Sequence, residues 1–212
     1  MPSASALDAV TVDALGTLVE LEDPVPKLRA SLAERGVERD AEHVRAAFLT
    51  EAAYYLQRSH EGRDAASLRD LRRRCAGVFL AAADADLDAG DFAPAFVAAM
   101  RLRTADGVVG ALDRLRAAGL ALACVTNWDA GFGEHLAALG LGDRFGAVVT
   151  SAEAGAPKPH PRMFELALAR LGVDPRRAVH VGDSDADREG AEAAGLSFEP
   201  VPLATVPDRL GL

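Results

Sequence analysis

Ala9-Val10-Thr11-Val12-Asp13 is a short, largely apolar run that ends on a carboxylate, and the repetition of this pattern decides the fold. A nearly unbroken apolar run is typical of a strand buried on both faces of a sheet. Helical patterns lie between the later runs, and each ends at a glycine, the usual left-handed C-terminal cap. Strand alternating with helix predicts an α/β fold with a parallel sheet and helices on both of its faces. The later runs occupy residues 120–125, 146–149, 178–181 and 196–198, and the helical patterns 107–118, 133–139, 162–171 and 187–194.

The interval between the first two apolar runs is too long for a single crossover helix. Residues from about 22 to 100 are rich in Ala, Leu, Arg and Glu, which favour helix, and hold no convincing strand. We therefore expect an all-helical cap, residues 21–102, inserted after the first strand and packed over one end of the sheet. Residues 1–20 and 103–212 would form the α/β core. The expected cap helices are 25–34, 41–57, 65–83 and 92–102.

Composition excludes several classes of protein. The 212 residues carry a formal net charge of −9, which disfavours nucleic acid or an anionic membrane as a partner because phosphate backbones require clustered Lys and Arg. Two cysteines exclude a disulfide framework and a Cys-rich metal site, and so indicate a reducing compartment. The start of the chain lacks the features of a leader, and no apolar run reaches about 18 residues. We expect a cytoplasmic monomer or homodimer.

Polar side chains follow the predicted strands at the edge where an open parallel sheet carries its functional groups. Asp13, Thr126, Lys158, Asp183 and Asp187 all belong to strand ends or to the loops that follow them. Three carboxylates are hard oxygen ligands of the kind that Mg²⁺ prefers. The lysine can neutralise charge on a nucleophile and on a transferred group. Together they predict an anion site that contains a nucleophile.

Four neighbouring residues are candidate substrate ligands. The backbone N–H groups of Gly16 and Thr17 follow Asp13 and can face a ligand, while the amide of Asn127 can donate to phosphoryl oxygens. Trp128, the only tryptophan, is a candidate wall of the pocket, although a core position would explain it equally well. Each residue alone has a plainer interpretation as a turn, cap or solvated charge. Their order along one sheet edge favours a site.

These stretches resemble the four motifs of the haloacid dehalogenase (HAD) superfamily. The matching residues are 10–18, 125–127, 158–159 and 181–187, and the helical insertion lies where that family places its C1 cap. The resemblance implies a Rossmann-like core and a covalent mechanism. Asp13 would attack the substrate, and water would hydrolyse the aspartyl intermediate. Thr126 and Lys158 would bind the transferred group.

The resemblance also implies a cofactor and a class of substrate. Mg²⁺ would be held by Asp13, Asp183, Asp187 and the backbone carbonyl of Leu15. The expected substrate is a small phosphorylated metabolite that the cap encloses during the reaction.

Leu15 departs from the family pattern. The second residue after the nucleophile of the family's phosphatases is usually an Asp that serves as general acid and base, and leucine cannot transfer a proton. Such catalysis contributes about 10²–10⁴-fold. We therefore expect a phosphatase whose turnover is slow, restricted to good leaving groups, or dependent on an acid from elsewhere, such as the cap.

Two alternatives remain open. A metal-independent 2-haloacid dehalogenase-like enzyme displaces halide, which needs no proton, and such members also lack the Asp. They resemble Ser-Ser-Asn where this chain has Gly182-Asp183-Ser184, which counts against this alternative. A catalytically weak member that acts as a binding or regulatory protein is the other, and the retained Asp13 and Lys158 count against it.

Several other residues are weaker candidates. His160 follows Lys158-Pro159 and is a candidate substitute acid, whereas His180, inside an apolar run, is expected to be a hydrogen-bonded core histidine. A polar and aromatic cluster in the predicted cap contains candidate specificity residues: Tyr54, Tyr55, Arg58, His60 and Arg63.

Overall fold

The central sheet has five parallel strands in the order β5-β4-β1-β6-β7. The computed structural model describes residues 7–212, so residues 1–6, where we looked for a leader, lie outside the described residues. The predicted α/β fold with a parallel sheet is confirmed, and each strand lies within two residues of its expected bounds. The strands are β1 (Ala9–Val12), β4 (Ala121–Thr126), β5 (Ala147–Thr150), β6 (Ala178–Gly182) and β7 (Ser197–Pro200).

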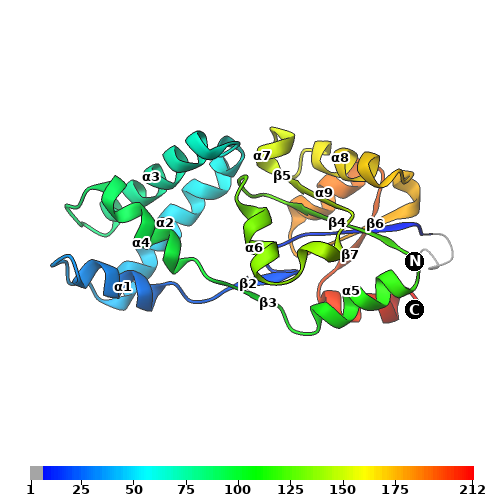
Figure 1. Ribbon diagram of the computed structural model, residues 1–212, viewed down its shortest axis with the longest axis horizontal. Helices are drawn as coiled ribbons and strands as arrows, with labels where there is room; N and C mark the ends of the chain where they lie inside the picture. The colour runs from blue at the N-terminus through cyan, green and yellow to red at the C-terminus, as the bar shows by residue number, and fades with distance from the viewer. Residues whose placement is uncertain (1–6) are drawn as a thin grey trace.

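Helices cover both faces of this sheet (Figure 1). Alternate residues of a strand point to opposite faces, and Val10 and Val12 accordingly pack with α5 and α6, whereas Ala9 packs with α8 and α9. This two-sided burial explains why the strands are apolar throughout. The helices are α5 (Val108–Ala117), α6 (Phe132–Ala138), α7 (Ser151–Ala154), α8 (Arg162–Leu171), α9 (Asp185–Ala193) and α10 (Val206–Arg209), with 3-10 turns at Gly142–Arg144, Pro175–Arg177 and Leu203–Thr205.

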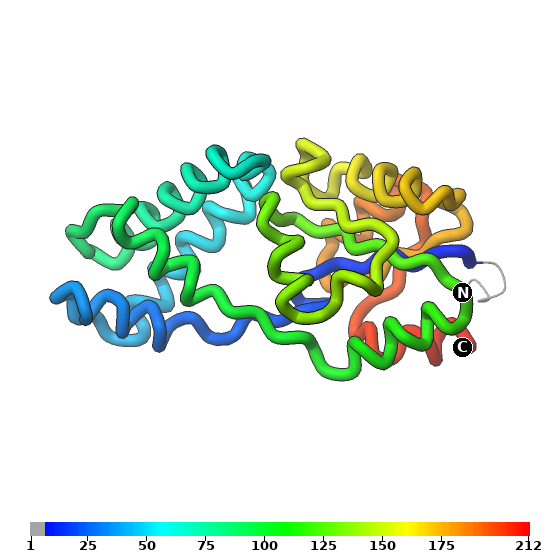
Figure 2. Tube along the Cα trace, viewed as in Figure 1, coloured from blue at the N-terminus to red at the C-terminus, as the bar shows by residue number. Residues whose placement is uncertain are grey.

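Four helices form a separate body beyond one end of the sheet (Figure 2). They are α1 (Val25–Ala33), α2 (Ala41–Arg58), α3 (Ala65–Ala82) and α4 (Ala89–Ala99), and the 3-10 turn Ser59–Glu61 follows α2. We call α1–α4 the cap. Its hydrophobic cluster, centred on Phe79 and Phe92, is distinct from the two clusters that flank the sheet. The exact division of the chain at residues 20/21 and 102/103 stays a prediction.

Two short strands join the cap to the sheet, and the sequence analysis missed both. β2 (Val19–Leu21) pairs antiparallel with β3 (Leu102–Thr104). The prediction of a helix over residues 92–102 was wrong about both ends, because α4 spans Ala89–Ala99. It begins earlier because the Asp88 side chain caps the N–H groups of Gly90 and Asp91, and it ends before Leu102 pairs with Leu21.

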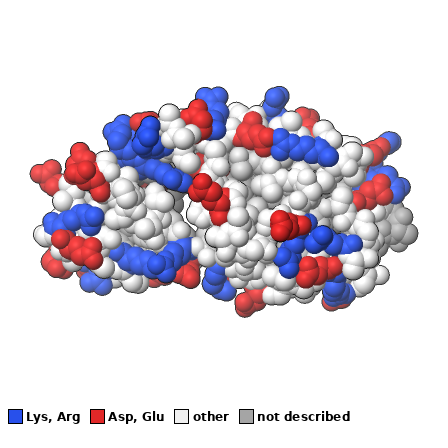
Figure 3. Space-filling model, in the orientation of Figure 1, with Lys and Arg blue, Asp and Glu red and all other residues white. Residues whose placement is uncertain are grey.

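Charged side chains of both signs are interspersed over the face of the molecule shown in Figure 3. Many of them pair with each other, as Arg170 does with Glu153 and Arg114 with Asp208. Across the described residues, the structure contains no helix with the length and apolarity needed to span a membrane.

Candidate active site

Strands β1, β4 and β6 end at the same level and place polar residues at one edge of the sheet. Val12 lies beside Cys124 and Val181 in the register of the sheet. Asp13 follows β1, and its backbone N–H donates to Val181 O at 2.9 Å. The neighbouring strand ends therefore bring Thr126 and Asp183 next to Asp13.

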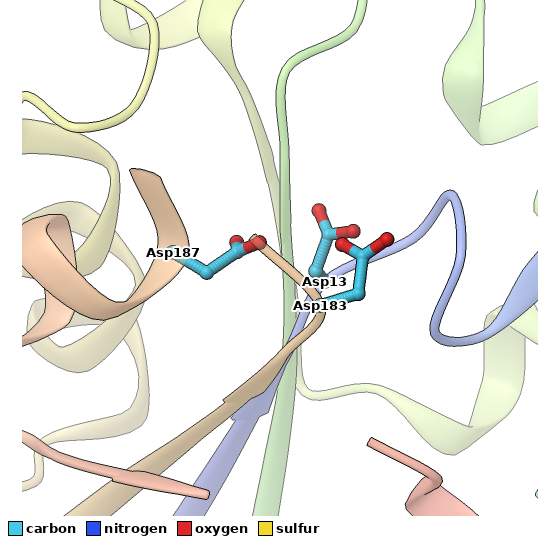
Figure 4. Close-up of side chains that lie close together, drawn as sticks. All are labelled: Asp13, Asp183 and Asp187. Carbon is cyan, nitrogen blue, oxygen red and sulfur yellow. The ribbon is translucent and has the colours of Figure 1, made fainter. Parts of the chain in front are cut away.

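Three carboxylates gather at this edge. One oxygen each from Asp13, Asp183 and Asp187 lies within 4.8 Å of the others. Figure 4 shows the carboxylates of Asp13 and Asp183 side by side, with that of Asp187 pointing toward them from the first turn of α9. Asp13 and Asp187 are buried, whereas Asp183 is exposed. Sequence-distant residues thus form the cluster that the strand ends predicted.

Two glycines make room for these carboxylates. Gly16 has φ of +85°, and a Cβ there would lie 2.1 Å from Asp183 Oδ2. A Cβ on Gly182 would lie 2.5 Å from the side chain of Asp187. The side chains of Asp183 and Asp187 therefore pack directly against backbone. A larger residue would be strained at Gly16 by its positive φ and at Gly182 by the buried Asp187 side chain.

Lys158 joins two of the carboxylates. Its Nζ donates to Asp13 Oδ1, to Asp187 Oδ1 at 2.5 Å and to Val125 O at 3.1 Å. Asn127 fixes the lysine's backbone, because its Oδ1 accepts from the Lys158 N–H at 2.7 Å. The buried ammonium is thus held at a fixed point between Asp13 and Asp187.

Burial and charge act in opposite directions on this cluster. Burial alone would lower the pKa of Lys158, but the charges of Asp13 and Asp187 outweigh it and raise that pKa, so the lysine is cationic. Burial raises the pKa of Asp13, and Lys158 opposes the effect. For Asp187, burial is outweighed by the hydrogen bond from His180 and the charge of Lys158, which lower its pKa.

His180 positions Asp187 from inside the sheet. Its Nε2 lies 3.1 Å from Asp187 Oδ1, and its Nδ1 lies 2.8 Å from Thr11 Oγ1. Burial lowers the pKa of His180, so the imidazole is neutral, with Nε2–H donating to Asp187 and Nδ1 accepting from Thr11. Ser184 Oγ donates to the second carboxylate oxygen at 2.5 Å. His180 is therefore the hydrogen-bonded core histidine that we expected, but its contact with Asp187 had no sequence signal.

A cavity of about 440 Å³ lies between the cap and this sheet edge. The sheet side is polar, and the cap side is mostly apolar. The sheet side includes the predicted residues Asp13, Leu15, Thr126, Asn127, Trp128, Lys158, Asp183 and Asp187. The cap contributes Phe48, Glu51, Ala52, Tyr55, Leu56, Leu71, Arg72, Cys75, Phe96, Val97 and Met100, none of which except Tyr55 was singled out from the sequence.

Gly16 and Thr17 do not present their backbone N–H groups as we expected. Gly16 N–H donates to Val19 O at 2.9 Å and Thr17 N–H to Ala14 O at 3.2 Å, so both close the turn after β1. Neither residue lines the cavity. Thr17 Oγ1 is buried and has no hydrogen-bond partner among the described residues.

Of the weaker candidates from the sequence, Tyr55 lies at the cavity and His160 does not. Of the five-residue cap cluster, only Tyr55 lines the cavity. His160 is exposed, and its Nδ1 accepts from the Arg162 N–H at 3.2 Å, so it does not occupy the position of a substitute acid in this structure.

Tyr55 belongs to a set of contacts that docks the cap on the loop between β4 and α6. Its hydroxyl donates to Asp129 Oδ2 at 2.9 Å and accepts from the Asp129 N–H at 3.3 Å. Ala130 N–H donates to Gly62 O at 2.8 Å. Outside this loop, the Ser59 hydroxyl lies 3.1 Å from the hydroxyl of Ser151 in α7. The loop that begins with Thr126 and Asn127 therefore also carries the cap.

The sequence model of the haloacid dehalogenase-like hydrolase family matches residues 7–195. The chain belongs to this family. The resemblance drawn from the four motifs is confirmed, and the chain is a hydrolase of the HAD superfamily.

Relatives of this HAD hydrolase include phosphatases and dehalogenases. Haloacid dehalogenase-like hydrolase domain-containing protein 3 of Mus musculus is 44% identical over 92 residues, which are 43% of this chain and 37% of that protein. Phosphoserine phosphatase of Thermus thermophilus is 42% identical over 87 residues, 40% of this chain and 35% of that enzyme. The matches thus span little more than a third of these curated relatives. The structure of a 2-haloacid dehalogenase from Pseudomonas syringae pv. Tomato DC3000 has a TM-score of 0.68 and 26% identity, and covers 97% of this chain and 98% of its own.

Proposed function

We propose that this HAD hydrolase is a Mg²⁺-dependent phosphatase that acts on a small phosphorylated metabolite through an aspartyl-phosphate intermediate on Asp13. The observation that carries the proposal is the cluster of Asp13, Asp183 and Asp187 with Lys158 held between two of them. Relatives named as phosphatases support the same reaction class.

The donor set fits a divalent cation. Three carboxylates and one ammonium group leave two negative charges unbalanced. Oxygen atoms are the ligands that Mg²⁺ prefers, and phosphatases of this superfamily generally use a divalent metal ion. Asp13, Asp183, Asp187 and the Leu15 carbonyl would hold it. When bound, Mg²⁺ would supply charge stabilisation for the phosphoryl oxygens.

The chain's own residues would carry out two displacements. An Asp13 oxygen attacks phosphorus, the bond from phosphorus to the leaving oxygen breaks, and its electron pair departs with the leaving group. Water then attacks the phosphorus of the aspartyl phosphate, loses a proton to solvent and frees the Asp13 carboxylate and inorganic phosphate. Lys158 neutralises charge on Asp13 and the phosphoryl group, and Thr126 and Asn127 donate to phosphoryl oxygens. Trp128, which lines the cavity, remains a predicted substrate contact.

Leu15 limits the leaving group. Its side chain lines the cavity where a phosphatase of this family would usually carry an acid, and it is 39% exposed. A leaving group that is stable as an anion needs no proton, whereas an alkoxide does. The proposed enzyme therefore favours acyl and aryl phosphates over alkyl phosphates.

Hydrolysis of acetyl phosphate and p-nitrophenyl phosphate, with Mg²⁺ and with EDTA, tests the proposal. We expect turnover that requires Mg²⁺ and is lost in Asp13→Asn. In Leu15→Asp we expect hydrolysis of alkyl phosphates to rise by at least about tenfold, toward the usual range of acid catalysis. An enzyme that turns over neither activated substrate under either condition is not a phosphatase of this kind.

Dehalogenation remains the second candidate because Leu15 supplies no proton and the fold matches a 2-haloacid dehalogenase along almost its entire length. Release of halide from 2-chloropropionate in EDTA would establish it. The same preparations and the same Asp13→Asn variant serve as controls for both reactions.

A further inference from the structure

One carboxyl group interrupts the apolar cap wall of the active-site cavity. Glu51 lies on α2 and lines the cavity together with Phe48, Ala52 and Leu56. It is only 4% exposed, although Glu is among the residues that are almost never fully buried without a partner. Its burial therefore calls for a physical explanation.

Glu51 has little to compensate this burial. Among residues 7–212 no N–H or hydroxyl group donates to it and no Lys, Arg or His pairs with it; the Cys75 thiol of α3, a weak donor, is its one hydrogen-bond partner. Burial raises the pKa of Glu51 to about 7. Buried polar atoms without strong partners are uncommon in folded proteins. The carboxyl group thus has unused hydrogen-bonding capacity at the cavity wall.

The other polar groups of the cap wall are accounted for. Tyr55 bonds to Asp129. Arg72 has no ion pair within the described part of the chain, but it is only half-buried, and a guanidinium that reaches solvent needs no partner. Glu51 is the member of this wall whose position favours a ligand.

We propose that Glu51 is a substrate-specificity residue, and that its carboxyl group accepts a hydrogen bond from a hydroxyl or amino group on the non-reacting part of an otherwise apolar phosphate ester. The inference rests on the proposed function, because that function places the phosphoryl group at Asp13 on the opposite wall of the cavity. The apolar neighbours Phe48 and Leu56 would contact the hydrocarbon body of the substrate.

Phosphonates test this recognition without depending on turnover. Linear alkylphosphonates of about three to six carbons suit a cavity of this size. Each length is prepared with a methyl, hydroxyl, amino or carboxylate terminus, and binding to the full chain in Mg²⁺ is measured by calorimetry. At the best length, we expect the hydroxyl or amino compound to bind at least about tenfold more tightly than the methyl compound.

Variants assign the preference to Glu51. In Glu51→Leu the donor-terminated compounds should lose this advantage. In Glu51→Gln, which has nearly the same shape and keeps an acceptor oxygen, the hydroxyl preference should remain and any additional preference for an ammonium group should disappear. Glu42→Leu, an exposed position on the same helix, is the control and should keep the selectivity of the unmodified chain.

Three results would overturn the inference: no binding of any donor-terminated compound, equal binding of all termini, or tightest binding of the carboxylate, which would point to Arg72. A uniform loss across all termini in Glu51→Leu and Glu51→Gln would instead show that Glu51 acts only in packing. Acetyl phosphate hydrolysis is measured on the same preparations. Selective binding without hydrolysis would refute the proposed phosphatase activity but support the Glu51 site. Hydrolysis without selective binding would support the phosphatase activity and refute the role of Glu51.

Discussion

Replacing Glu51 with Gln should change how the stability of the protein depends on pH. The folded state raises the pKa of Glu51 from 4.5 to about 7 because burial disfavours the charged form. The folded protein therefore keeps this proton over a range in which the unfolded chain has released it. The stabilisation that comes from the protonated Glu51 is complete below about pH 4.5 and is lost as pH rises through about 7. Gln has no proton to lose.

The size of the effect follows from the shift. Each pKa unit corresponds to about 1.36 kcal/mol, so a rise from 4.5 to about 7 corresponds to about 3 kcal/mol. Between about pH 4.5 and 8, the free energy of unfolding of Glu51→Gln should therefore gain about 3 kcal/mol relative to the unmodified chain. Other titrating groups are common to both proteins and cancel in the difference.

Urea denaturation across this pH range, followed by circular dichroism, measures the difference. Glu42→Gln on the exposed face of the same helix controls for the general effect of removing one carboxylate. Parallel pH profiles for Glu51→Gln and the unmodified chain would refute the reasoning, because they would show that the Glu51 side chain is hydrated or paired. The experiment tests the burial of Glu51 independently of any substrate.

Three further substitutions test the remaining contacts. Lys158→Met leaves Asp13 and Asp187 buried without a counterion, so at neutral pH without divalent ions unfolding should become about 3–5 kcal/mol easier, as measured by urea denaturation; Mg²⁺ should restore part of this loss. His180→Phe removes the donor that orients Asp187, and calorimetry should show Mg²⁺ binding weakened by about 10–100-fold; unchanged binding would mean that Ser184 alone positions this carboxylate. Tyr55→Phe removes both hydrogen bonds to Asp129 and should lower the free energy of unfolding by about 1–2 kcal/mol, with KM rising more than kcat falls; an effect on kcat alone would argue against a docking contact.

The sheet and the carboxylate cluster were predictable because both follow from local patterns. The apolar runs that end at Asp13 and Asp183 are buried on both faces, and a parallel register necessarily brings their carboxyl ends to one edge. Lys158 was predicted from its place in the segment that follows β5. In each case, the residues next to the functional side chain in the sequence indicate that it lies at the end of a strand or in the segment that follows one.

The cap wall was not predictable in the same way. Glu51 and Cys75 meet only because α2 packs on α3, and the abundant alanines leave helix faces ambiguous in the sequence. The pairing of β2 with β3 was missed because three-residue strands are too short to show a period. Asp187 shows a third difficulty, which is that one residue can have two roles. It completes a capping box with Ser184 at the start of α9 and also belongs to the carboxylate cluster, so the sequence pattern supports both interpretations.

The β2–β3 ribbon has a mechanical consequence. Both chain crossings between the cap and the sheet run through this one antiparallel pair, so the cap has a single hinge. In Figure 1 the ribbon lies in the lower part of the view, whereas the start of α3 and α7 lie near the top. A cap that moved about this ribbon would have to break the hydrogen bonds on its far side, namely those that Tyr55, Ser59 and Gly62 make with Asp129, Ser151 and Ala130. The loop that carries Thr126 and Asn127 takes part in these contacts, so separation of the cap from the sheet would release this loop next to the proposed phosphoryl site.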